Sequence, residues 1–463
     1  MVVRDKNGPV TNLAKDDFTI FDNGKAQRVS RPKYRWQSRA CLVNVRADSE
    51  MCYQFMIHMR RFINCIIFAV VLIWANQQMW PQQRGAAQQG RRTQERDILY
   101  VAVPNDLVRP SSIDNGGIGI LAFNVRDGHR FVKRIPTWDY PAGKEPEVIR
   151  GIAASPVSGM LFVSTRGRMA SFSLTTEKLV WEQTYDGDCC DRVAVSPDGK
   201  TLYVPRDGGA HWYVVDAVTG KLIKTLATPE TDGAHNTIWS LDGSRVFMSG
   251  QRSRVMSVAD PKTHTLVQTI GPFTNFVRPF TTNGTNTYLF ANVNDLLGFE
   301  VADLRTGKMI HRVEVNGFGW NRDRRIPHQV PSHGIAMSPD EKEIWVADGV
   351  NVFIHVFDAT VMPPKQVKSI QMPEVPGWIT FGLDGKLVYS SSGDVIDAST
   401  KEIVTALKDE FGRPVRSEKI VEVLYVDGKP TRAVDQIGVG LVTRPGSKYS
   451  GPPERRQPRN RAW

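Results

Sequence analysis

Residues 191–226 read DRVAVSPDGKTLYVPRDGGAHWYVVDAVTGKLIKTL, and this stretch decides the fold. Apolar and polar residues alternate in short segments between two turn signals, Pro197-Asp198-Gly199 and Thr219-Gly220. Alternation of period two between Gly, Pro and Asp clusters is typical of short antiparallel strands. The stretch therefore predicts a four-stranded meander with strands at 192–195, 201–205, 212–216 and 221–226.

The same pattern recurs along the chain. Equivalent turns begin at six positions spaced by 41, 44, 41, 57 and 44 residues, namely Ser155, Ser196, Ser240, Thr281, Ser338 and Gly382. Repeats of about 40–50 residues with four strands each are typical of β-propellers. One such unit cannot bury both faces of its sheet, whereas units stacked around an axis bury them all.

The motif "apolar-SPDGK-x-LYV … V-D-x-x-TGK" resembles the YVTN-type (YncE-like) β-propeller repeat, a WD40-like repeat common in secreted prokaryotic proteins. The resemblance covers about residues 98–443 and implies an all-β fold, a seven-bladed β-propeller of four-stranded antiparallel blades. Propellers include lactonases, haem and quinone enzymes and pure binding proteins, so the resemblance leaves the function open.

The first blade is expected to close the ring. Residues 98–103, 118–125 and 131–136 match the second, third and fourth strands of the other units, so this blade lacks an innermost strand. We expect residues 436–443, QIGVGLVT, to supply it, because closure removes an open sheet edge. Within the extra segment 409–430, a strand and turn at 422–428 indicate an added hairpin before closure.

The formal net charge of +11 is concentrated outside the repeats. Residues 1–61 carry a net charge of +6, residues 84–96 of +3 and residues 444–463 of +5, which leaves −3 for residues 97–443. A nearly neutral body argues against a nucleic-acid partner.

The N-terminal residues do not fit the repeat. Residues 2–28 resemble one edge of the von Willebrand A-related domain of acidobacterial proteins, without its nucleotide- and metal-binding parts. We interpret residues 1–58 as a fusion remnant or a mis-called start; the alternative is a small β-module that pairs with a partner strand.

Residues 59–76 read as a targeting segment. A basic start, Met59-Arg60-Arg61, precedes the apolar run FINCIIFAVVLIWA, which is typical of a secretory signal peptide; an uncleaved membrane anchor is the alternative. We therefore expect a periplasmic or secreted monomer that touches the membrane only through this segment. Residues 77–96 are predicted to be a disordered linker, and residues 444–463 a disordered Pro/Arg-rich tail.

Candidate site residues lie where the chain enters each innermost strand. The position five residues before the turn holds Arg150, Asp191, His235, Phe276, His333 and Gly377. Asp191, His235 and His333 could hold a divalent metal, and Arg192 adds a cation beside them; the alternative is that each caps its own loop.

The long connection 316–329 is expected on the face where the chain enters the innermost strands. It contains Trp320, Arg324, Arg325 and His328. Aromatic and Arg side chains together suit an anionic or planar ligand. The alternative is a solvated loop whose Trp packs on the neighbouring blade.

Cysteine usage adds one further candidate. Beyond residue 76 only Cys189 and Cys190 remain, an adjacent pair that could form a vicinal disulfide or a redox pair, or stay as two thiols. No CxxCH motif is present in the sequence, which excludes a covalently attached c-type haem.

The leading hypothesis is a scaffold that binds a protein or small-molecule ligand on one face of the central channel. The alternative is an enzyme with its site at the same channel mouth, either a lactonase-like hydrolase or a cofactor- or metal-dependent oxidoreductase. The sequence does not identify the cofactor; a divalent metal is the candidate.

Overall fold

The computed structural model describes residues 4–5, 8–9, 20–22, 25–27, 94–103, 117–138, 147–186, 189–321, 327–434 and 441–442. The chain divides into two compact units, Met1–Gly90 and Arg91–Trp463. In the first unit, β1 (Arg4–Asp5) pairs with β2 (Gly8–Pro9), and β3 (Ile20–Asp22) pairs with β4 (Lys25–Gln27). The expected signal peptide at 59–76 and the C-terminal tail at 444–463 lie outside the described residues.

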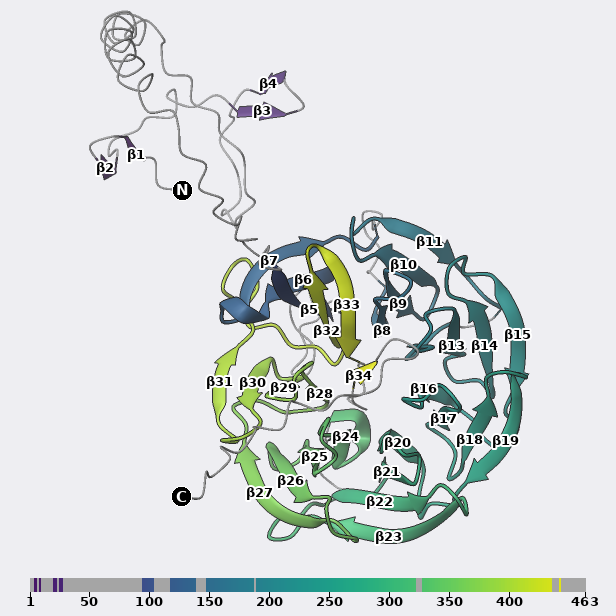
Figure 1. Cartoon of the computed structure of the whole chain (residues 1–463). Helices are drawn as coiled ribbons and strands as arrows, with labels where there is room; N and C mark the ends of the chain where they lie inside the picture. Colours follow the sequence, from purple (N-terminus) through teal and green to yellow (C-terminus); the bar gives the residue numbers. More distant parts are fainter. Residues whose placement is uncertain are drawn as a thin grey trace, which may run out of the picture. The chain divides into compact units, whose positions relative to one another are not determined.

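In the second unit the sheets are arranged radially around a central axis (Figure 1). Blade 1 contains β5 (Glu95–Val103), β6 (Gly119–Asn124) and β7 (Arg130–Ile135). Blade 2 contains β8 (Ile149–Ser155), β9 (Met160–Thr165), β10 (Met169–Ser173) and β11 (Leu179–Gln183). Blade 3 contains β12 (Ala194–Val195), β13 (Thr201–Pro205), β14 (His211–Asp216) and β15 (Leu222–Ala227). Blade 4 contains β16 (Ala234–Trp239), β17 (Val246–Gly250), β18 (Met256–Asp260) and β19 (Thr265–Ile270).

The remaining blades follow the same order. Blade 5 contains β20 (Val277–Thr282), β21 (Tyr288–Val293), β22 (Gly298–Asp303) and β23 (Lys308–Glu314). Blade 6 contains β24 (Ser332–Met337), β25 (Glu343–Asp348), β26 (Phe353–Asp358) and β27 (Lys365–Gln371). Blade 7 contains β28 (Ile379–Phe381), β29 (Leu387–Ser390), β30 (Asp394–Asp397) and β31 (Ile403–Ala406). The predicted seven-bladed β-propeller is confirmed.

The turn residues quoted from the sequence build the hairpins of blade 3. Gly199 has φ of 71° and Gly220 of 72°, the left-handed region that glycine enters without steric cost. The Ser196 hydroxyl accepts a hydrogen bond from the amide of Thr201 at 2.9 Å, and the Asp216 carboxylate accepts one from the amide of Thr219 at 2.8 Å. These local contacts explain why the meander could be read from a contiguous stretch.

The strand that closes the ring differs from the predicted one. β32 (Ile420–Val426) pairs antiparallel with β5, from Ile420 opposite Val101 to Val426 opposite Glu95, so it takes the place that the first strand of the four-stranded pattern has in the other blades. β33 (Lys429–Val434) and β34 (Leu441–Val442) extend that sheet to six strands. The assignment of residues 436–443 as the closing strand was therefore wrong: among the described strands, β34 pairs with β33 and not with β5. The segment expected to be an added hairpin supplies the closing strand, because its longer apolar run buries both faces.

The hydrophobic core is divided among the interfaces between adjacent blades. The largest fully buried side chains include Tyr203, Trp212, Phe280 and Trp345, each on a strand that faces a neighbouring sheet. Among the described residues, the helical segments are the 3-10 turns η3 (Val125–Asp127) and η4 (Pro327–Gln329), and none is long and apolar enough to cross a bilayer.

Candidate functional site at the channel mouth

In blades 2, 4, 5 and 6 the innermost strand begins with a β-bulge. The strand register shifts between Ile149 and Gly151, between Ala234 and Asn236, between Val277 and Phe280, and between Ser332 and Ile335. An extra residue in a bulge bends the strand and redirects a side chain, and such bulges are frequent beside functional sites. The residues at these bulges include Arg150, His235, Arg278 and His333. The structure therefore places Arg278, rather than Phe276, at the position in blade 5 that corresponds to the other three.

Asp191, His235 and Arg150 form one polar group. A hydrogen bond joins the Asp191 carboxylate to Nδ1 of His235, and Arg150 Nη2 lies 3.7 Å from the same carboxylate oxygen. Burial would raise the pKa of Asp191, but His235 and Arg150 hold this pKa below its ordinary value. Burial lowers the pKa of His235 in spite of Asp191. The pair is therefore an ionised carboxylate that accepts a hydrogen bond from a neutral imidazole, which leaves the lone pair on His235 Nε2.

Arg192 contacts residues that precede strands of two other blades. Its Nη2 lies 2.5 Å from Oε2 of Glu418, and its guanidinium carbon lies 3.7 Å from the centre of the Trp378 ring. The Arg192 side chain is only 3% exposed, yet its Nε and Nη1 have no hydrogen-bond partner among the described residues. A buried guanidinium normally satisfies its donors, so the N–H donors of these two nitrogens could bind a further acceptor.

His328, His333 and Glu418 form a second group. The two imidazole rings stack at 9° with centroids 3.8 Å apart. Oε1 of Glu418 lies 2.8 Å from Nε2 of His328 and 3.7 Å from Nδ1 of His333. His333 Nδ1 is also 3.0 Å from the carbonyl oxygen of Gly377, which can accept its proton.

The charges in this group are unevenly distributed. Burial would raise the pKa of Glu418, but His328, Lys419 and Arg192 hold this pKa well below its ordinary value. Burial and the neighbouring His328 place the pKa of His333 well below its ordinary value. The group therefore offers an anionic oxygen and a neutral imidazole, which are the forms of Glu and His that bind metals.

The structure brings some of the sequence candidates together and separates others. Arg150, Asp191 and His235 are in contact, and His333 contacts His328 instead of His235. Trp320 packs against the hydrophobic core between blades 5 and 6. Arg324 and Arg325 lie outside the described residues.

Two residues of the site were not predicted from the sequence. Glu418 precedes the closing strand and belongs to no repeat, so no register pointed to it. Arg278 lies two residues beyond the expected position in its blade, and the shift follows from a local bulge. The sequence signal for Glu418 is that the charged pair Glu418-Lys419 stands immediately before an apolar run.

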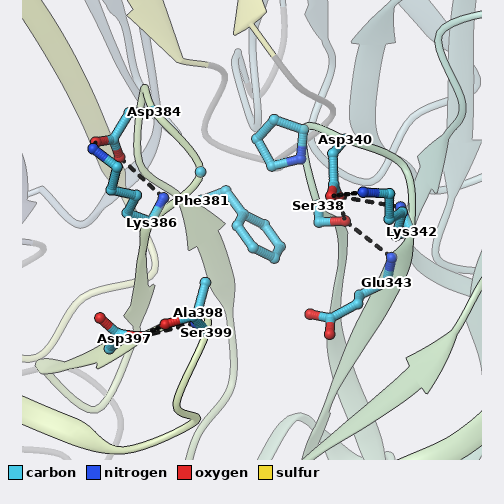
Figure 2. A pocket seen from close by; sticks show the side chains of 12 residues that line it. Ser338, Asp340, Lys342, Glu343, Phe381, Asp384, Lys386, Asp397, Ala398 and Ser399 are labelled. Carbon is cyan, nitrogen blue, oxygen red and sulfur yellow. Dashed lines mark hydrogen bonds and ion pairs between the residues drawn. The ribbon is translucent and has the colours of Figure 1, made fainter. Parts of the chain in front are cut away.

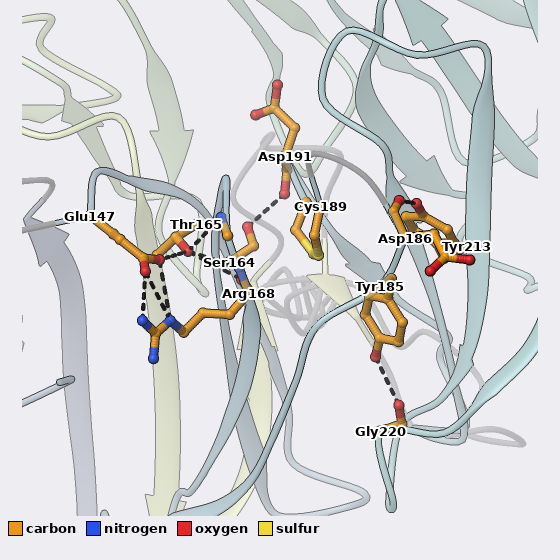
Figure 3. The surroundings of a disulfide bond; sticks show 12 residues. Glu147, Ser164, Thr165, Arg168, Tyr185, Asp186, Cys189, Asp191, Tyr213 and Gly220 are labelled. Atoms are coloured by element: carbon orange, nitrogen blue, oxygen red, sulfur yellow. Dashed lines mark hydrogen bonds and ion pairs between the residues drawn. A yellow bond between two sulfur atoms is a disulfide. The ribbon is translucent and has the colours of Figure 1, made fainter.

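The cysteine pair lies beside this site. Cys189 and Cys190 form a disulfide and are completely buried. Figure 3 shows Cys189 next to Asp191, whose backbone carbonyl accepts a hydrogen bond from Ser164 at 2.6 Å. The pair packs in the core between blades 2 and 3, where it anchors the chain just before Asp191 and Arg192.

A separate hollow of about 390 Å³ lies between blades 6 and 7, at the other ends of their innermost strands (Figure 2). Several of its polar groups bond within their own turns: Ser338 donates to Asp340 at 2.7 Å, and the amide of Lys386 donates to Asp384 at 3.0 Å. Glu343 instead pairs with Lys401 of blade 7 at 2.6 Å. The hollow is thus a gap between repeated turns, and the candidate site remains the opposite mouth of the channel.

The fold and this site define the class of protein, a β-propeller with a charged channel mouth. No protein-family model and no curated protein matches the chain. Among solved structures, the chain is similar to Kuenenia stuttgartiensis hydrazine synthase, at 18% identity and a TM-score of 0.45 over 56% of this chain and 80% of that one.

Proposed function

We propose that this protein is a binding scaffold that takes a small anionic ligand at the mouth of its central channel. The observation that carries the proposal is Arg278, on the innermost strand of blade 5. Its Nε donates a hydrogen bond to Asn294 at 2.5 Å, and no carboxylate pairs with it within the part of the chain that the structure describes. Burial lowers the pKa of Arg278, as expected for a cation with no compensating anion.

The neighbouring groups favour the same ligand class. Arg150 at the corresponding bulge donates to Asp207 at 3.0 Å and keeps 29% of its side chain exposed, and Nε and Nη1 of Arg192 have no hydrogen-bond partner among the described residues. Guanidinium groups bind carboxylates and phosphates through paired N–H donors. A carboxylate or phosphate would therefore supply the missing acceptors at this mouth.

Thermal unfolding and calorimetric titration of the full chain test this function. The ligands would be inorganic phosphate and a series of mono-, di- and tricarboxylates. We expect at least one of them to raise the melting temperature, and Arg278→Gln to remove that effect. Arg305→Gln is the matched control, because Arg305 lies on a turn with 82% of its side chain exposed. Equal stabilisation of wild type and Arg278→Gln would contradict the proposal.

A second candidate function rests on the Asp191–His235 pair. A carboxylate that orients an imidazole leaves Nε2 able to act as a general base, and Arg150 beside it could stabilise an oxyanion. This arrangement would suit a lactonase-like hydrolase. Lactone hydrolysis would be measured for the wild type, His235→Ala and Asp191→Asn. Activity in the wild type and none in the variants would favour the hydrolase, provided that both variants keep the wild-type circular dichroism spectrum.

The sequence supports the finer parts of the proposal. The repeated SPDGK and TGK turns favour kinship with YVTN-type propellers, and the run at 59–76 favours export to the periplasm or beyond. Edman sequencing of the protein recovered from a bacterial periplasm would test the export, with a start after residue 75 or after residue 87 expected.

A further inference from the structure

We propose that His328, His333 and Glu418 bind a divalent first-row transition metal, with Zn²⁺ as the reference ion. This inference goes beyond anion binding and does not depend on it. One ligand atom from each of the three residues lies within 4.8 Å of the others. Ligands in a tetrahedral zinc site, at about 2.0–2.2 Å from the ion, are separated by about 3.3–3.5 Å. The pair His328 Nε2 and Glu418 Oε1, at 2.8 Å, would therefore move apart slightly, and the wider separations, up to 4.8 Å, would contract.

The ligand atoms of His328 and Glu418 are buried and close together. Glu418 Oε1 and His328 Nε2 are 2.8 Å apart, which is within ion-pair distance. Both atoms are buried, and neither has a hydrogen-bond partner among the described residues. Unpartnered buried polar atoms are rare, and an ion is one way to satisfy them. Two nitrogen ligands and one carboxylate oxygen are a donor set that suits Zn²⁺ or Fe²⁺ and leaves coordination positions open.

Gly377 preserves the space between the ligand atoms. A Cβ on Gly377 would lie 3.0 Å from Glu418 Oε1 and 3.2 Å from His328 Nε2. A side chain at this position would therefore crowd the two atoms that we assign as metal ligands. The carbonyl of the same residue accepts the Nδ1 proton of His333, which places the lone pair of that ring on Nε2.

A second layer of contacts orients the ligands. Arg192 and Lys419 approach Oε2 of Glu418, at 2.5 Å and 3.5 Å, and so direct Oε1 toward the histidines. Metal-binding carboxylates and imidazoles are typically held in this way by groups outside the coordination sphere. The His328 side chain is 21% exposed and connects the buried ligands with solvent.

The experiment uses the full chain, stripped with a chelator and dialysed, and then titrated with Zn²⁺ in a calorimeter. Co²⁺ is added separately, because its visible absorption reports coordination by nitrogen and oxygen ligands. The variants are His328→Ala and Glu418→Gln, which each remove a ligand, and Gly377→Ala, which removes none. His311→Ala on β23 is the matched control, and thermal unfolding verifies the fold of every variant.

We expect one Zn²⁺ to bind per wild-type chain and to raise the melting temperature. Affinity should fall at least tenfold in His328→Ala, Glu418→Gln and Gly377→Ala and stay unchanged in His311→Ala. Absence of Zn²⁺ binding to the folded wild type would overturn the proposal. Equal Zn²⁺ binding by wild type and His328→Ala would also overturn it. A loss of Zn²⁺ binding in His235→Ala alone would overturn it too, because it would assign the metal to the group of Asp191 and His235. Arg278→Gln should retain Zn²⁺, so failure of anion binding remains distinguishable from failure of the metal site.

Discussion

Arg192 Nη2 and Glu418 Oε2 lie 2.5 Å apart, although 226 residues separate them in the sequence. Arg192 precedes the innermost strand of blade 3, whereas Glu418 precedes the strand that closes blade 1. The same guanidinium stacks on Trp378, which precedes the innermost strand of blade 7. One buried cation therefore joins three blades across the channel and sets the orientation of the Glu418 carboxylate.

Replacement of Arg192 by Met should destabilise the propeller by about 1.5–3 kcal/mol, because the buried Glu418 carboxylate loses one charge-assisted hydrogen bond while His328 and Lys419 remain beside it. Denaturant unfolding followed by tryptophan fluorescence measures the change. The double variant Arg192→Met/Glu418→Gln should recover part of the loss, since it removes the carboxylate that had lost the Arg192 hydrogen bond. A loss below about 1 kcal/mol in the single variant would show that solvent already compensates Glu418.

Ring closure should depend on the hydroxyl of Tyr425. This hydroxyl donates to the carbonyl of Leu174 at 2.9 Å and lies 2.7 Å from the hydroxyl of Tyr100, so it links β32 with blades 1 and 2. Tyr425→Phe leaves both partners unpaired in a buried site and should cost about 1–3 kcal/mol. The change in melting temperature measures this, with Tyr288→Phe on a partly exposed strand as the control. Equal melting temperatures for the two variants would argue against a role for the hydroxyl.

Stability should depend on pH through Glu422 on the closing strand. Burial raises the pKa of Glu422 from 4.5 to about 7, so the folded state retains this proton after the unfolded chain has lost it. The free energy of unfolding therefore loses a contribution as pH rises from about 4.5 to about 7, on the order of 3 kcal/mol in total. Glu422→Gln should abolish this contribution.

Denaturant unfolding of wild type and Glu422→Gln between pH 4 and pH 8 measures the Glu422 effect as a difference between the two proteins. Carboxylates with lowered pKa, such as Asp191, contribute in the opposite direction and cancel in that difference. Glu402→Gln on an exposed turn is the control. A constant difference across this range would mean that Glu422 titrates alike in both states.

The disulfide between Cys189 and Cys190 should be visible in the mass of a single tryptic peptide, residues 179–192. Alkylation under denaturing conditions without reductant should leave both residues unmodified, with a peptide mass about 2 Da below that of the dithiol form. Prior reduction should allow both to be alkylated. Alkylation of both residues without reductant would show that they are thiols.

The fold could be predicted because each blade is encoded in a contiguous stretch. Strands such as β13 and β14 follow from alternation of apolar residues, and the turns between them follow from Ser196, Gly199 and Gly220 acting on their own neighbours. The closing strand was assigned to the wrong segment because pairing between β32 and β5 joins residues more than 300 positions apart.

The sequence by itself therefore determined the number and architecture of the blades and indicated which strand entries carry polar residues. Only the tertiary structure decided which of those residues meet. His333 contacts His328 and Glu418 rather than His235, and Arg278 takes the bulge position in blade 5. The reason is physical: turn chemistry and alternation act within a few residues, whereas the side chains of a channel mouth converge from separate blades. Their meeting depends on strand register, bulges and ring closure, which no single stretch encodes.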